Sequence, residues 1–121
     1  MTKLFRILCL VFLSLSASPL FADADVSGRW KGAIQTPQAP LQVEVDFVRD
    51  GDGWKGDITV PQQKSVDRPL EVVVEGWTVT FRMPKIPGDP TFHGSVAANS
   101  KLITGDFTQN GKKFRFRLER E

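Results

Sequence analysis

Apolar and polar residues alternate along most of the chain between residues 28 and 120, and this period of two is the strongest constraint on the fold. Side chains on a β-strand point alternately to its two faces, so each alternating run predicts a strand with one buried face. No segment shows a helical pattern longer than one turn. The sequence therefore predicts an all-β fold of about eight short strands. The apolar runs span residues 30–34, 41–47, 54–60, 70–74, 77–83, 92–96, 103–107 and 114–118.

Turn signals separate these runs and predict that consecutive strands pair in an antiparallel meander. Asn110-Gly111 is a strong hairpin signal, because both residues tolerate the positive φ that a tight primed turn needs. Asp50 to Gly53 and Glu75-Gly76 mark two further reversals. A small up-and-down barrel or half-barrel of about eight strands is the expected architecture, because closure leaves no exposed strand edge. A two-sheet β-sandwich is the alternative.

Glycine recurs on the inner face of four runs, in the pattern large apolar, any residue, Gly, any residue, apolar. A glycine weakens a strand unless the backbone bends there or another group approaches it closely. We expect these glycines to allow the curvature of a coiled sheet. Space cleared for a ligand is the alternative interpretation. The four positions are Gly32, Gly56, Gly94 and Gly105.

The first 24 residues have the layout of a secretory signal peptide, with a short basic head, an apolar run and a small-residue stretch. The apolar run is about half the roughly 20 residues that a membrane-spanning helix needs, so we expect no permanent membrane anchor. Ala22-Asp23-Ala24 fits an A-x-A cleavage site, and cleavage after Ala22 is the near alternative. We therefore expect an exported protein, periplasmic or secreted, with residues 1–24 as signal peptide and residues 25–121 as a single domain.

Few residues of this sequence could take part in catalysis or bind a metal ion. Cys9 lies in the expected signal peptide, so the mature domain has no thiolate and no disulfide. His93, the single histidine, lies two residues from Ser95 on one expected strand, too far apart for a nucleophile and its base. Asp50-Gly-Asp52-Gly resembles the start of a calcium loop but lacks the later ligands. We expect no catalytic residue, no metal and no cofactor.

The charge distribution argues against a nucleic-acid partner. The formal net charge is only +2, whereas nucleic-acid binders carry a large basic excess. Lys113, Arg115 and Arg117 face outward on the last expected strand, and closure of the barrel would place them beside the first strand. This basic stripe could contact an acidic partner or a lipid headgroup. A solvated face, partly neutralised by Glu44 and Asp46, is the alternative interpretation.

The connections between the expected strands differ in length at the two ends of a meander. One end collects residues 36–40, 61–69 and 84–90, all of which contain proline, whereas the other end has only tight links. Barrel mouths commonly bind small molecules, so we expect an apolar small molecule or a protein partner at the long-loop end. The candidate binding residues are Gln63, Arg68 and Ile86 in these loops and the inner-face tryptophans Trp30, Trp54 and Trp77.

A series of short motifs runs through nearly the whole expected domain. They are Gly28-x-Trp30-x-Gly32, Gly56-Asp-Ile58-x-x-Pro61-x-Gln63, Arg68-Pro69-Leu70, Val79-x-Phe81-x-x-Pro84, Phe92-x-Gly94, Ile103-x-Gly105-x-Phe107-x-Gln109 and Leu118-x-Arg120. Their order and spacing resemble the β-rich domain that precedes the catalytic domain in many secreted bacterial α/β hydrolases. The catalytic residues of that hydrolase domain do not occur here, so none is carried over. The resemblance implies an accessory or remnant domain that works only in complex with an enzyme.

A looser resemblance is to lipocalin-like barrels, whose Gly-x-Trp on the first strand packs against a basic residue near the end of the chain. Gly28 and Trp30 match the first part of that arrangement. Arg117 or Arg120 would supply the basic residue.

Overall fold

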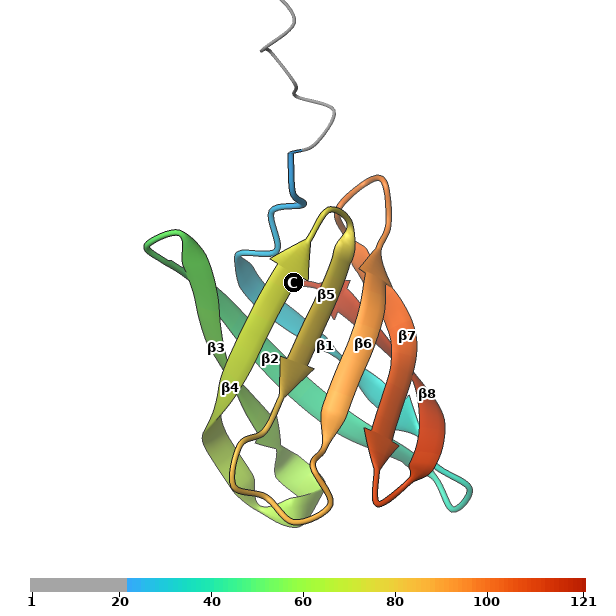
Figure 1. The fold of residues 1–121 in the computed structure, drawn as a ribbon. Coiled ribbons are helices and arrows are strands. Elements are labelled where there is room, and N and C mark those ends of the chain that lie inside the picture. Colours follow the sequence, from blue (N-terminus) through green and yellow to red (C-terminus); the bar gives the residue numbers. More distant parts are fainter. Residues whose placement is uncertain (1–21) are drawn as a thin grey trace, which may run out of the picture.

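The computed structural model describes residues 22–121, which form a closed antiparallel β-barrel of eight strands (Figure 1). Each strand pairs with the next along the chain, and the last pairs with the first. This confirms the predicted up-and-down barrel and excludes the half-barrel and the sandwich. The elements are β1 (Gly28–Gln35), β2 (Pro40–Asp50), β3 (Gly53–Val60), the 3₁₀ turn η2 (Pro61–Gln63), β4 (Ser65–Glu75), β5 (Thr78–Arg82), β6 (Thr91–Val96), β7 (Leu102–Gln109) and β8 (Lys112–Arg120).

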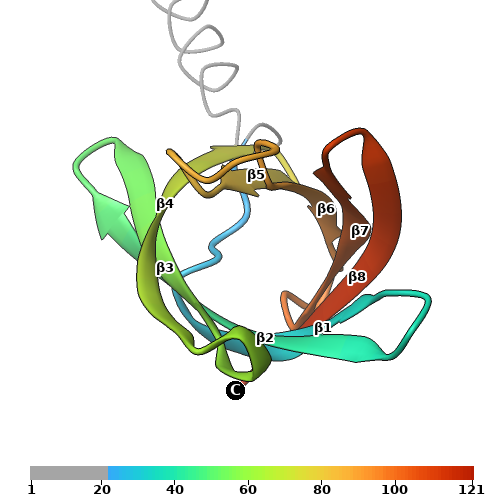
Figure 2. The same ribbon diagram turned by 90° about the horizontal axis from the view of Figure 1, so that it is seen from below.

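The seam between β1 and β8 closes the ring that Figure 2 shows along the barrel axis. Trp30 lies opposite Arg120, and Ile34 lies opposite Phe116. Most of the expected signal peptide lies outside the described residues.

The inner-face glycines allow neighbouring strands to approach closely where the sheet coils. A Cβ atom at Gly32 would collide with the backbone carbonyl of Arg117 across the β1–β8 seam. A Cβ atom at Gly105 would collide with the carbonyl of His93 on β6. The space at these two positions is filled by backbone, so curvature explains them and a cleared ligand site does not.

Aromatic side chains fill the middle of the barrel. Phe81 stacks on Phe92 with ring centroids 4.5 Å apart, and Phe47 and Phe116 meet Phe81 edge to face. Such contacts add to the stability that burial of the rings provides. No polar or charged residue is buried among residues 22–121, so this part of the interior is held by apolar packing alone.

The segment 22–27 covers one end of the barrel, which we call the plugged end. Val26 is fully buried, and its carbonyl accepts a hydrogen bond of 2.9 Å from the indole nitrogen of Trp30. The backbone N–H of Ala24 donates to the carbonyl of Gly76 at 2.8 Å, in the turn between β4 and β5. The connections of the plugged end are short, as the sequence predicts.

Two expectations about local structure are wrong. Trp77 was expected to be enclosed by the barrel, but the residue is 46% exposed, because it lies in the turn before β5 begins at Thr78. The segment 61–69 was expected to be one long loop, but strand β4 already begins at Ser65. Pro69 lies within β4 opposite Asp57 of β3, so the connection itself is only the short η2 turn and Lys64.

Candidate ligand-binding site

The connections β1–β2, β3–β4, β5–β6 and β7–β8 gather at the end of the barrel opposite the plug, which faces the viewer in Figure 2. We call it the long-loop end, although two of its connections, β3–β4 and β7–β8, are short. The longest connection is residues 83–90 between β5 and β6. The hairpin between β7 and β8 has the predicted turn, with φ of +54° at Asn110 and +76° at Gly111.

A cavity of about 220 Å³ opens at the long-loop end, and we call it the mouth cavity. Aliphatic side chains from β1, β2 and β3 form one wall, including Ile34, Val43 and Ile58. Residues of β6, β7 and β8 supply an aromatic wall, formed by Phe92, Phe107 and Phe114. The interior is therefore filled in its middle and hollow at one end.

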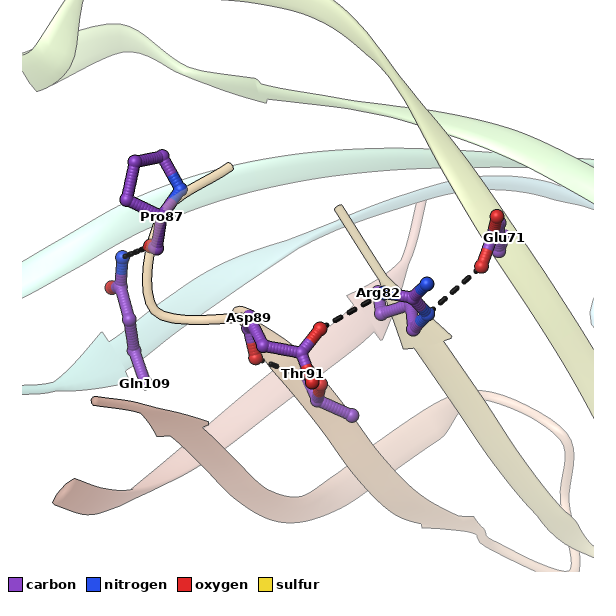
Figure 3. Close-up of polar contacts among 6 residues, drawn as sticks. All are labelled: Glu71, Arg82, Pro87, Asp89, Thr91 and Gln109. Atoms are coloured by element: carbon purple, nitrogen blue, oxygen red, sulfur yellow. Dashed lines mark hydrogen bonds and ion pairs between the residues drawn. The ribbon is translucent and has the colours of Figure 1, made fainter. Parts of the chain in front are cut away.

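The segment 83–90 covers part of the mouth cavity and contributes Ile86 to its lining. Figure 3 shows the contacts that hold this segment in place. Arg82, at its base, pairs with Asp89 at 2.9 Å and with Glu71 of β4 at 2.8 Å. The side-chain amide of Gln109 donates to the carbonyl of Pro87 at 3.1 Å. These polar contacts tie the cover to β4 and β7.

The η2 turn closes another side of the mouth. The side-chain carbonyl of Gln62 accepts a hydrogen bond of 2.6 Å from the backbone N–H of Gln42. Its amide donates to the carbonyl of Pro40 at 3.2 Å, so Gln62 joins this turn to the start of β2. Its neighbour Gln63 lines the mouth cavity.

Only two of the six candidate binding residues meet at this cavity. Gln63 and Ile86 line it from two different loops. Arg68 is exposed on β4, where its guanidinium donates to the hydroxyl of Ser65 at 3.2 Å. The three tryptophans lie toward the other end. Trp30 is buried below the plug, Trp54 is half-buried and Trp77 is exposed.

The inner-face residues near the long loops were not selected as site residues from the sequence. Leu41 begins the inward phase of β2, and Met83 follows the end of β5. The signal that could have found them is an inward phase at a strand end that borders a long loop.

A second, more open hollow of about 380 Å³ lies at the plugged end beside the 22–27 segment. The guanidinium of Arg49 stacks over the ring of Trp54 at 4.9 Å from its centroid. Asp25 also lines this hollow, and hydrogen bonds from the hydroxyl and the backbone N–H of Ser27 lower the pKa of its carboxyl.

The expected basic stripe lies on the outside of the β1–β8 seam, and several of its charges are paired. Arg117 contacts Glu119 at 3.0 Å, and Arg115 contacts Asp106 at 3.1 Å. Lys31 lies 3.8 Å from the carboxylate of Glu121. A shallow groove of about 480 Å³ follows this seam, but positive and negative side chains both line it. Mixed charge favours the solvated-face interpretation over a binding site for anions.

Acidic side chains gather on the outer face of β2, β3 and β4. Burial, together with the nearby carboxylates of Asp67 and Asp46, raises the pKa of Asp57. A hollow of about 140 Å³ lies among these carboxylates, and Glu44 and Thr59 also line it. Residues 22–121 contain no group of three or more ligating side chains arranged to hold a metal ion.

Comparison of the chain with protein-family models, with curated proteins and with solved structures finds no match. Between residues 22 and 121, no helix has the length and apolar character needed to cross a membrane.

Proposed function

We propose that this protein is an exported, non-catalytic β-barrel that binds an apolar small molecule in the mouth cavity. One observation carries the proposal. The barrel interior is packed with side chains from the plug to its middle, but it opens into an apolar cavity beneath the longest connection. Ligand sites are typically concave and mostly apolar, with a few polar groups, and they favour the mouths of barrels.

The placement of His93 supports the non-catalytic part of the proposal. His93 is exposed on the outer face of β6, away from the mouth cavity. Its Nδ1 lies 2.9 Å from the hydroxyl of Thr80 on the neighbouring strand. The lining of the cavity itself contains no histidine, carboxylate or lysine that could serve as a general base.

Native mass spectrometry of the protein purified from its host tests the proposal directly. We expect a fraction of the protein to carry a small organic molecule that an organic solvent extracts. A mass equal to the bare chain, together with no binding of apolar dyes, would contradict the proposal. Co-purification of a hydrolase instead of a small molecule would favour the accessory-domain alternative, and esterase activity of the isolated protein would overturn the non-catalytic assignment.

A variant that narrows the mouth sharpens the test. Leu41 lines the cavity near its opening and is only partly buried, so Leu41→Trp should fill space without disturbing the middle of the barrel. We expect this variant to lose at least tenfold in affinity for an apolar dye. Val66→Trp is the matched control, because Val66 is 65% exposed and lies outside the cavity lining.

A further inference from the structure

We propose that the mouth cavity selects a compact, uncharged molecule with an apolar body and one hydrogen-bonding group, which meets the side-chain amide of Gln63. This inference rests on the proposed function and adds a ligand class to it. The size of the cavity, the chemistry of its walls and the hydrogen bonds at its rim each support it.

The size of the mouth cavity limits the ligand to a small molecule. Pockets for drug-sized ligands usually measure roughly 300–1,000 Å³. An apolar cavity of roughly 150 Å³ is enough to bind benzene. The mouth cavity, at about 220 Å³, lies between these sizes and fits a substituted single ring or a short branched chain.

The lining of the mouth cavity excludes a charged ligand group. All residues that line it are apolar except Thr36, Gln63 and Gln109. A carboxylate or ammonium group that enters such a site loses its hydration and gains no partner of opposite charge, which is strongly unfavourable. Arg82, at the base of the covering segment, is already paired with Glu71 and Asp89. A ligand that would bury a carboxylate or an ammonium group in this cavity is therefore disfavoured.

At the rim of the mouth cavity, Gln63 has a side-chain amide whose donor and acceptor are both available to a ligand. The hydroxyl of Thr36 donates to the carbonyl of Ala39, and the amide nitrogen of Gln109 donates to Pro87. Gln63 is exposed at the rim of the cavity, and its side chain takes part in none of the hydrogen bonds formed within residues 22–121. A glutamine amide can donate and accept, so it suits a hydroxyl, a carbonyl or an amide on the ligand.

The two walls favour a flat apolar body. Phe114 lines the mouth beside Phe107 and is only partly buried, so its ring is accessible to a ligand. Leu41 and Met83 also line the mouth and are only partly buried, whereas Ile34 and Ile58 lie deeper and are almost fully buried. An aromatic ligand ring can pack against a phenyl ring on one side and against methyl groups on the other.

Met83 provides a direct reporter for this cavity. The chain contains only two methionines, Met1 and Met83, and Met83 lines the cavity whereas Met1 lies in the expected signal peptide. Protein labelled with ¹³C at the methionine methyl group is titrated with four probes of similar size, namely toluene, benzyl alcohol, benzoate and benzylamine. The indole N–H signals of the tryptophans, which lie toward the plugged end, report on any change elsewhere.

We expect benzyl alcohol to shift the Met83 methyl signal in a saturable way and to bind at least tenfold more tightly than benzoate or benzylamine. Gln63→Ala should lower the affinity for benzyl alcohol by about fivefold, which corresponds to the loss of one neutral hydrogen bond, and should leave the affinity for toluene unchanged. Gln38→Ala is the matched control, because Gln38 is exposed at the same end but does not line the cavity.

The outcomes separate this inference from the proposed function. Equal binding of benzoate or benzylamine would overturn the ligand class while the cavity remained a binding site. An unchanged affinity for benzyl alcohol in Gln63→Ala would overturn the assigned polar contact. If none of the four probes shifts the Met83 signal in folded protein, the ligand class fails. If, in addition, the protein binds no apolar dye and purifies as the bare chain, the proposed function itself is contradicted.

Discussion

Arg120 joins three segments of the chain at the plugged end. Its guanidinium lies over the ring of Trp30 at 4.4 Å from the centroid and donates to the carbonyls of Asp25, Ser27 and Ser100. Arg120→Ala removes the cation–π contact and leaves these carbonyls without their donor. We therefore expect a loss of about 3 kcal/mol in the free energy of unfolding, measured by urea denaturation.

Arg117→Ala is the control for this prediction, because Arg117 lies on the same strand and is paired only with exposed Glu119. Its loss should cost less than about 1 kcal/mol. The resemblance to lipocalin-like barrels implied either arginine as the partner of Trp30, and in the structure Arg120 packs over its ring. Equal losses for the two variants would contradict the role assigned to Arg120.

Asp57 gives the protein a pH-dependent stability of opposite sign to that of most carboxylates. Burial and the carboxylates of Asp67 and Asp46 raise the pKa of Asp57 above its ordinary value of 3.8. The folded state therefore holds this proton more tightly than the unfolded state, so its contribution to stability falls as pH rises through the raised pKa. Asp57→Asn should stabilise the protein by about 0.5 kcal/mol at pH 7 and give no gain below pH 3.8.

Thermal unfolding at a series of pH values checks this prediction. Asp25→Asn is the informative counterpart, because its hydrogen bonds from Ser27 lower the pKa of the carboxyl. That variant should lose stability above pH 3.8, where the unfolded carboxyl is ionised, and match the parent only under more acidic conditions. A uniform gain for Asp57→Asn at every pH would show that the ionisation of Asp57 is not its cause.

The three tryptophans illustrate what alternation can and cannot predict for single residues. Each begins an apolar run in the sequence, yet Trp30 is buried, Trp54 half-buried and Trp77 exposed. Alternation fixes which face a side chain occupies but not how far along the barrel axis it lies. Trp77 keeps the inward phase but precedes the first paired residue of β5, so the barrel wall does not cover it.

The segment 22–27 is an element that local sequence signals could not reveal. Its residues carry no strand pattern, and only the contacts with Gly76, Trp30 and Arg120 show that it belongs to the folded domain.

The start of β4 was also not predicted from local sequence signals. Pro61 and Pro69 suggested one long loop, but Pro69 pairs in register with Asp57, so the strand is longer than its proline content indicates.

If the protein is exported as proposed, the contacts of the segment 22–27 predict the position at which the expected signal peptide is cleaved. Gly76 donates its backbone N–H to the carboxylate of Asp23 at 2.6 Å and accepts from Ala24, whose side chain is only 3% exposed. Cleavage after Ala22 preserves both hydrogen bonds, whereas cleavage after Ala24 deletes them. We therefore expect the intact mass of the exported protein to correspond to a chain that begins at Asp23.

A chain engineered to begin at Asp25 is the control. It should lose about 1–2 kcal/mol in the free energy of unfolding, because two hydrogen bonds and the buried Ala24 are removed. An exported protein that begins at Asp25 and unfolds at the same urea concentration as the longer chain would contradict the prediction.

Closure is a property of the whole molecule, and the order of strands in the sequence did not determine it. Eight alternating runs joined by turns are compatible with a barrel or with two packed sheets. A closed barrel forms only if the first strand can pair with the last. Here Gly32 lets the backbone of β1 approach that of β8, and the 22–27 segment covers the interior beside them. The size of the mouth cavity likewise follows from packing between strands distant in the sequence.

Gly32→Ala tests closure directly. The added Cβ atom would meet the carbonyl of Arg117, which is backbone and cannot rotate away, so β1 and β8 must separate. We expect a loss of more than about 2 kcal/mol in the free energy of unfolding. Separation also exposes two strand edges, which promotes self-association detectable by light scattering during size-exclusion chromatography.

Ala33→Val is the matched control for Gly32→Ala. The side chain of Ala33 lines the open groove on the outer face of the seam, so the larger side chain should change the free energy of unfolding by no more than about 0.5 kcal/mol. A Gly32→Ala protein that is monomeric and as stable as this control would show that β1 and β8 do not need this close approach.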